Sequence, residues 1–147
     1  MIASSLLFGC GGQKKQSSVK FTAFGTRTLV KGKPHVVLIT SSSFSHCQSQ
    51  PLIRLTANYR WSEIAKGFST PAKTTWVYDP LTLGGSRQTI RSTDQPFKYD
   101  GLHPFLADWI MSGSSKGYPD GSFSVTTKFG NKPLLRNAIR VDTKKGC

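Results

Sequence analysis

From Val19 onward the chain consists of short alternating or continuous apolar runs, and turn-forming residues separate these runs. Alternation with a period of two indicates strands that place one face on a core, and short runs bounded by Gly, Pro, Asn and Ser are typical of antiparallel β-proteins. No internal repeat is visible. The pattern restricts the chain to an all-β, mainly antiparallel fold.

The C-terminal part gives the clearest hairpin. Its turn lies at 130–133, and its inward positions are predicted to be Phe123, Val125, Thr127, Phe129, Leu135, Ile139 and Val141. Elsewhere, Val36–Ile39 is continuously apolar, which favours a central strand buried on both faces. Seven or eight strands are expected in all.

Two segments have helical spacing instead. Trp61, Ile64, Ala65 and Phe68 predict a short helix that ends near Gly67, and Leu102, Phe105, Leu106, Trp109 and Ile110 predict a second one with Asp100 as its cap. The expected fold is therefore all-β with two short helices. A jelly-roll-like sandwich is the favoured version, and a closed β-barrel is the alternative.

Residues 1–18 are interpreted as a flexible basic N-terminal arm, and 19–147 as a single β-rich domain. The Leu6–Cys10 run resembles a lipoprotein signal because a small residue stands directly before a cysteine. No basic residue precedes the run, however, and the run is shorter than the roughly 7–15 apolar residues of such signals. An arm that packs on the domain or a neighbour is the expected structure.

Charge is the most informative part of the composition. The 20 Lys and Arg residues outnumber the 7 Asp and Glu residues, which leaves a net charge of +13. Glu63 is the one acidic residue before Asp79. Such a chain is attracted to polyanions and repels itself.

Catalytic and metal chemistry receive little support from the residues. One Glu and six scattered Asp form no evident acid–base pair, and His35, His46 and His103 lie far apart. We expect no enzyme activity, cofactor or metal. Cys10, Cys47 and Cys147 are not closely spaced and are odd in number, which favours a reducing compartment. No apolar run approaches the roughly 20 residues of a membrane span.

Two groups of basic residues are candidate nucleic-acid contacts. The first follows the arm into the first hairpin, and the second recurs at period two on the outward faces of later strands. They comprise Lys14, Lys15, Lys20, Arg27, Lys31 and Lys33, and then Arg87, Arg91, Lys128, Arg136, Arg140, Lys144 and Lys145. The alternative is that these residues keep the protein soluble and deter pairing at strand edges.

Tyr59 and Trp61 flank Arg60, which is a mixture of rings and charge typical of single-strand-binding surfaces. They are candidate stacking residues. Both also fit an ordinary core, so the two interpretations stay open.

The profile as a whole is similar to that of small viral structural proteins, with abundant Ser, Thr and Gly, scant Glu, a basic arm and a β-rich body. The resemblance implies a capsid subunit that self-assembles into an oligomer or shell and contacts the genome, RNA more than DNA, in the virion or host cytoplasm. A matrix-like protein that binds anionic membrane or nucleoprotein is one alternative. A cellular single-strand-binding β-barrel is another.

Overall fold

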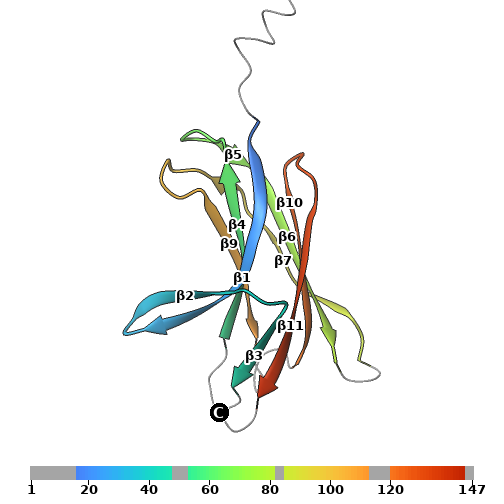
Figure 1. The fold of residues 1–147 in the computed structure, drawn as a ribbon. Coiled ribbons are helices and arrows are strands. Elements are labelled where there is room, and N and C mark those ends of the chain that lie inside the picture. Colours follow the sequence, from blue (N-terminus) through green and yellow to red (C-terminus); the bar gives the residue numbers. More distant parts are fainter. Residues whose placement is uncertain (1–15, 48–52, 82–84, 113–119, 145–147) are drawn as a thin grey trace, which may run out of the picture.

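The computed structural model describes residues 16–47, 53–81, 85–112 and 120–144, which form two β-sheets packed face to face (Figure 1). Eleven strands and no helix occur within these residues. The sheets stay separate, so the fold is a β-sandwich and not a closed barrel. The expected all-β, mainly antiparallel class is confirmed. No helix in the described residues could cross a bilayer.

The first sheet, here called sheet A, has four strands in the order β2-β1-β4-β9. All its pairings are antiparallel. The strands are β1 (Ser18–Val30), β2 (Lys33–Ile39), β4 (Ile53–Ser62) and β9 (Phe105–Ser112). A bulge in β1 between Phe21 and Ala23 bends this long strand, and its second half leaves the sandwich with β2 as a projecting hairpin (Figure 1).

The second sheet, sheet B, has five strands in the order β3-β11-β10-β6-β7. They are β3 (Ser43–Cys47), β6 (Ala72–Pro80), β7 (Gln88–Asp94), β10 (Gly121–Phe129) and β11 (Leu135–Lys144). The β3–β11 pairing is parallel, and the others are antiparallel. A small pair, β5 (Ser69–Thr70) with β8 (Phe97–Lys98), closes one end.

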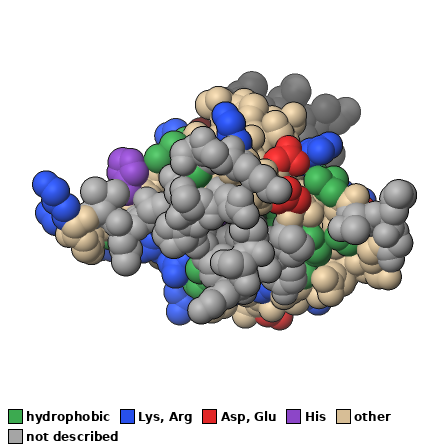
Figure 2. Space-filling model, turned by 90° about the horizontal axis from the view of Figure 1, so that it is seen from below, with side chains coloured by type: hydrophobic (Ala, Val, Ile, Leu, Met, Phe, Trp, Pro, Cys, Tyr) green, Lys and Arg blue, Asp and Glu red, His purple; other side chains and the backbone are tan. Residues whose placement is uncertain are grey.

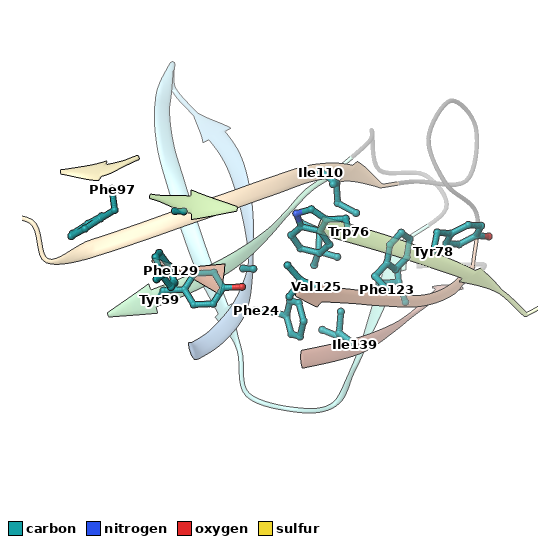
Figure 3. Close-up of a cluster of buried hydrophobic side chains, with 14 of the residues drawn as sticks. Phe24, Tyr59, Trp76, Tyr78, Phe97, Ile110, Phe123, Val125, Phe129 and Ile139 are labelled. Atoms are coloured by element: carbon teal, nitrogen blue, oxygen red, sulfur yellow. The ribbon is translucent and has the colours of Figure 1, made fainter. Parts of the chain in front are cut away.

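The core is aromatic and lies between the two sheets (Figure 3). Sheet A contributes Tyr59 and Trp61, and sheet B contributes Trp76 and Phe129. The Tyr59 and Phe129 rings meet edge to face at 5.4 Å, a favourable geometry for aromatic pairs. The alternation predicted for β10 is confirmed, because its four inward residues are all fully buried.

Polar groups inside the sandwich are mostly paired. The Tyr59 hydroxyl lies 2.6 Å from the Thr127 hydroxyl, which donates to Thr74. The Trp76 indole N–H donates to the Asp108 carboxylate at 2.8 Å. These bonds connect sheet A to sheet B, because Tyr59 and Asp108 belong to the first and their partners to the second.

The helix predicted over 61–68 is wrong. Strand β4 continues to Ser62, and Glu63 and Gly67 then adopt positive φ angles of 57° and 91°. Positive φ is incompatible with a right-handed helix. Trp61 and Phe68 do share one side, since their rings lie 5.0 Å apart, but a turn brings them together.

The helix predicted from Leu102 is also wrong, because this segment forms β9. Asp100 caps a turn, as its carboxylate accepts hydrogen bonds from the backbone N–H groups of Leu102 and His103. The chain then pairs with β4 in extended form. Ile110 is buried while Phe105 is 56% exposed, so the apolar stripe divides between two faces of a sheet.

The prediction of a buried central strand at Val36–Ile39 is wrong as well. These residues belong to β2, which lies at the edge of sheet A and pairs with β1 alone. Val36, Val37 and Leu38 are 46–54% exposed. In the view from below, the hairpin extends to one side and ends in basic side chains (Figure 2).

Candidate functional site

The outer face of sheet A follows from the inward direction of its buried residues. Leu55, Ala57, Tyr59 and Trp61 of β4 are buried in the core, so the intervening residues point outward. The register then aligns outward residues of three strands in rows. Lys20, Arg60 and Phe105 form one row; Ala23, Asn58 and Ala107 the next; Gly25, Thr56 and Trp109 the third; and Arg27, Arg54 and Met111 the fourth.

We call this surface the cationic face, defined by Lys20, Arg27, Arg54, Arg60, Phe105 and Trp109. Its basic residues stand at both ends, and Arg54 and Arg60 are about 20 Å apart along β4 at roughly 3.3 Å per residue. Among the described residues, no outward position of β1, β2, β4 or β9 is acidic, and none of the four basic side chains forms an ion pair. The positive charge on this surface is therefore uncompensated locally.

Trp109 holds two arginines in place. The guanidinium carbon of Arg54 lies 3.9 Å from the Trp109 ring centroid, and that of Arg91 lies 4.6 Å from it. Arg91 comes from β7 of the other sheet, and its Nε is buried without a hydrogen-bond partner among the described residues. Cation–π attraction thus gathers charge from both sheets at one edge of the cationic face.

At the other end, Arg60 lies over Phe105, with 5.5 Å between guanidinium carbon and ring centroid. Phe105 is more than half exposed. Between the two ends Gly25 has no side chain, and a Cβ there would lie only 2.9 Å from the Thr56 hydroxyl. Asn58 is fixed by donating to the Ala23 carbonyl.

The outer face of sheet B, here called the hydroxyl face, differs in composition. Its basic residues are Lys73, Lys128, Arg136, Arg140 and Lys144, its acidic residues are Asp79, Asp94 and Asp142, and Ser and Thr fill most other positions. Arg140 donates to Asp142 at 3.1 Å, and Lys73 lies directly opposite Asp94 on the neighbouring strand. Charge on this face is largely balanced.

The candidate residues predicted from sequence are therefore divided among several places. Lys20 and Arg27 lie on the cationic face, and Lys31 and Lys33 on the projecting hairpin. Lys128, Arg136 and Arg140 lie on the hydroxyl face, on the opposite side of the sandwich. Arg91 points to the Trp109 edge, while Arg87 is exposed just before β7 and Lys144 ends β11. Lys14, Lys15 and Lys145 lie outside the described residues.

The predicted stacking residues are wrong. Tyr59 and Trp61 are fully buried, with 0% and 2% of their surface exposed, so they belong to the core. Burial raises the pKa of Tyr59 to about 12, and the nearby Asp108 carboxylate adds to the rise. The exposed ring is Phe105, and the ring that organises arginines is Trp109. Phe105, Ala107 and Trp109 are spaced two residues apart, which indicates one face of a strand. The same segment also fits a helical pattern, and the prediction followed the helical pattern.

Other polar clusters have structural explanations. Asp100 accepts a hydrogen bond from the His103 ring at 2.6 Å, which lowers the pKa of the Asp100 carboxyl well below its usual range. Both residues stabilise the turn before β9. A groove of about 500 Å³ between β1, β2 and β11 has no charged residue in its lining. Within the described part of the chain, no three potential ligands are grouped as a metal site.

Cys47 is disulfide-bonded at the end of edge strand β3. The chain has three cysteines, and the other two, Cys10 and Cys147, lie outside the described residues. This bond bears directly on the compartment, because disulfides persist in oxidising environments.

No known protein family matches this sequence, and no curated protein matches it either. Among solved structures, it is similar to an immunoglobulin-like protein from Pseudomonas aeruginosa, with a TM-score of 0.53 and 12% identity over 88% of this chain and 99% of that one. A β-glucosidase from Erythrobacter marinus gives a TM-score of 0.39 and 9% identity, with 85% of this chain and 15% of that one covered. The extracellular domain of a putative hybrid two-component system from B. thetaiotaomicron gives 0.38 and 9%, with coverage of 96% and 16%.

The likeness to the Pseudomonas protein concerns the fold alone. It is an immunoglobulin-like fold, which is a different β-sandwich from the jelly roll that the sequence favoured.

Proposed function

We propose that this chain binds single-stranded nucleic acid, RNA in preference to DNA, through the cationic face. The observation that carries the proposal is the set of four basic side chains on one sheet surface without a described acidic neighbour. A surface of this kind attracts phosphates and releases their counterions. The imbalance is smaller on the hydroxyl face, because Asp residues accompany its lysines and arginines.

Each part of the cationic face has a defined role in this proposal. Arg54 and Arg60 contact phosphates, since both lie on the outer face of the sheet and are held there over aromatic rings. Phe105 offers its exposed surface to a base, as in proteins that stack unpaired bases on rings. Backbone contacts carry little sequence information, so binding is weakly sequence-specific.

The proposal is tested by fluorescence anisotropy with a labelled single-stranded RNA of mixed sequence at several salt concentrations. Each phosphate neutralised on a single strand lowers log K by about 0.7 per tenfold rise in salt. Contacts from all four basic residues give a slope near −3. Absence of binding at low salt, or a slope near zero, contradicts the proposal. If anionic vesicles bind the protein as strongly as RNA does, as judged by a pelleting assay, the partner is a membrane surface and not nucleic acid.

The role of capsid subunit stays a prediction from the sequence profile. It requires self-association in addition to nucleic-acid binding. Electron microscopy of the purified protein with RNA tests it: regular particles are expected, and a uniform monomer with and without RNA contradicts it.

We also propose that the protein works in an oxidising compartment, which replaces the reducing one expected from the cysteine count. The bonded state of Cys47 carries this proposal. Alkylation without reduction, followed by intact mass measurement, should add one label to a chain of three cysteines. Three labels on protein from its native source contradict the proposal.

A further inference from the structure

The edge strand β2 presents an apolar segment that nothing in the described residues covers. Val36, Val37 and Leu38 follow one another on a strand that hydrogen-bonds to β1 on one side only. All three are about half exposed. Such an edge offers unpaired backbone N–H and C=O groups together with apolar side chains, which is a template for an additional strand.

The two halves of this edge differ in protection. Near the hairpin tip, Lys33 and Pro34 block pairing, because a lysine disfavours apolar association and proline has no N–H to donate. From Val36 onward, β2 has neither device before it ends at Ile39. The tip therefore limits the registers in which an additional strand could pair with the unprotected half.

We propose that β2 pairs antiparallel with β2 of a second copy of this chain, about a two-fold axis at Val37. The two-fold axis could pass through Val36, Val37 or Leu38. Only an axis at Val37 places each of these exposed apolar residues opposite another exposed apolar residue of the second copy. Val37 then faces its own copy, and Val36 faces Leu38 on both sides of the axis. A centre at Val36 would instead place Val37 opposite His35.

Charge also fits this register. In an antiparallel pair about Val37, Lys33 lies opposite Ser41 of the other copy, and His35 lies opposite Ile39. The Lys31 side chains at the two hairpin tips point to opposite ends of the pair. No like charges meet directly, which is the condition for a self-complementary, isologous interface.

The pairing has a geometric consequence for the rest of the molecule. A two-fold axis at an antiparallel strand pair is perpendicular to the sheet, so both copies present the same face of sheet A on one side. The two four-stranded sheets join into a continuous sheet, and the two cationic faces lie side by side on its surface. The inference itself does not depend on what those faces bind.

The test is the mass of the full-length protein in solution, without nucleic acid, by sedimentation or light scattering over a range of concentrations. We expect a dimer that dissociates on dilution. Val37→Lys should abolish it, because two lysines would meet at the axis. Leu134→Lys is the matched control: Leu134 is 51% exposed against 52% for Val37, but lies in the turn before β11. That variant should remain dimeric.

Folding of Val37→Lys is checked by thermal unfolding, and it should match wild type because the side chain lies outside the core. If that variant does not fold, Val37→Cys with a short thiol-to-thiol cross-linker gives the second measurement. It should yield covalent dimers, and Leu134→Cys should not. A wild-type protein that is monomeric at high concentration, or a dimer that survives Val37→Lys, overturns the proposal.

Discussion

The two outer faces of the sandwich carry similar numbers of basic residues on the same kind of scaffold but have different electrostatic properties. The cationic face has four Lys or Arg residues with no acidic residue on its described strand positions, whereas the hydroxyl face has five with three Asp residues among them. Basic content alone therefore does not identify a binding surface. The placement of the few acidic residues decides which face attracts anions.

The faces also differ in what lies beneath their charges. Arg54 and Arg60 rest on Trp109 and Phe105, so part of the entropic cost of ordering these long side chains is met before a ligand arrives. On the hydroxyl face, Arg140 is instead engaged by Asp142. Binding there would first have to break an existing ion pair.

The largest expected effect separates the two faces directly. Arg54→Glu with Arg60→Glu should weaken single-stranded RNA binding on the order of 100-fold at low salt, because two attractive phosphate contacts become repulsive. Arg136→Glu with Arg140→Glu makes the same change in net charge on the hydroxyl face. Binding by that variant should fall by a few-fold only.

Both double variants are compared by anisotropy at matched ionic strength, after circular dichroism shows native structure. Equal losses from the two pairs would mean that net charge, and not the cationic face, governs binding. A larger loss from Arg136 and Arg140 would reverse the assignment of the faces.

A smaller effect tests the ring chemistry of the cationic face. Phe105→Ala should weaken binding about tenfold, since base–ring stacking contributes about 1–3 kcal/mol per base. Phe105→Tyr should bind as wild type does. Leu102→Ala is the control, because Leu102 is 78% exposed and lies three residues before β9. If Phe105→Ala binds RNA as strongly as wild type does, the cationic face binds by electrostatic attraction alone and not by base stacking.

Trp109 tests whether preorganisation of the arginines matters. Trp109→Leu should weaken binding about fivefold while the net charge is unchanged, because Arg54 and Arg91 lose the ring that holds them. Trp109→Phe keeps a ring and should recover most of the affinity. A salt slope equal to that of wild type in both variants would confirm that the same phosphates are contacted.

Strand alternation in the sequence predicted the β10–β11 hairpin and its buried side, and these are confirmed. It predicted the wrong structure where an apolar sequence permits two periods. Leu102, Phe105, Leu106, Trp109 and Ile110 fit a helical stripe, but pairing with β4 divides them between the two faces of sheet A. Whether such a segment forms a helix or a strand depends on what it pairs with in the folded protein. That pairing cannot be derived from the periodicity of one sequence.

The same limit explains the missed site residues. Arg54 and Arg60 were not among the predicted contacts, which included Arg136 and Arg140, although Asp142 lies only two residues from Arg140 and pairs with it. Asp94 lies opposite Lys73 only because β6 and β7 pair. Val36–Ile39 indicated burial by its apolar run, but its position at an edge follows from strand order, which periodicity does not encode.

The last prediction concerns the core that keeps the two faces on opposite sides of the molecule. Tyr59 of sheet A and Thr127 of sheet B share a buried hydrogen bond. Tyr59→Phe should lower the free energy of unfolding by about 1 kcal/mol near pH 8, a modest loss because Thr127 still donates to Thr74. RNA affinity should be unchanged, as neither residue reaches either face.

Alkaline pH should remove this difference. The pKa of Tyr59 is raised from 10.0 to about 12 in the folded protein, so above pH 10 the unfolded state releases its proton first and wild-type stability falls as the pH rises toward 12. By pH 11 this costs wild type about 1 kcal/mol, whereas Tyr59→Phe has no such group. Urea unfolding at pH 8 and pH 11 should therefore show the two proteins converging. A constant gap would mean that the Tyr59 hydroxyl is not buried between the sheets.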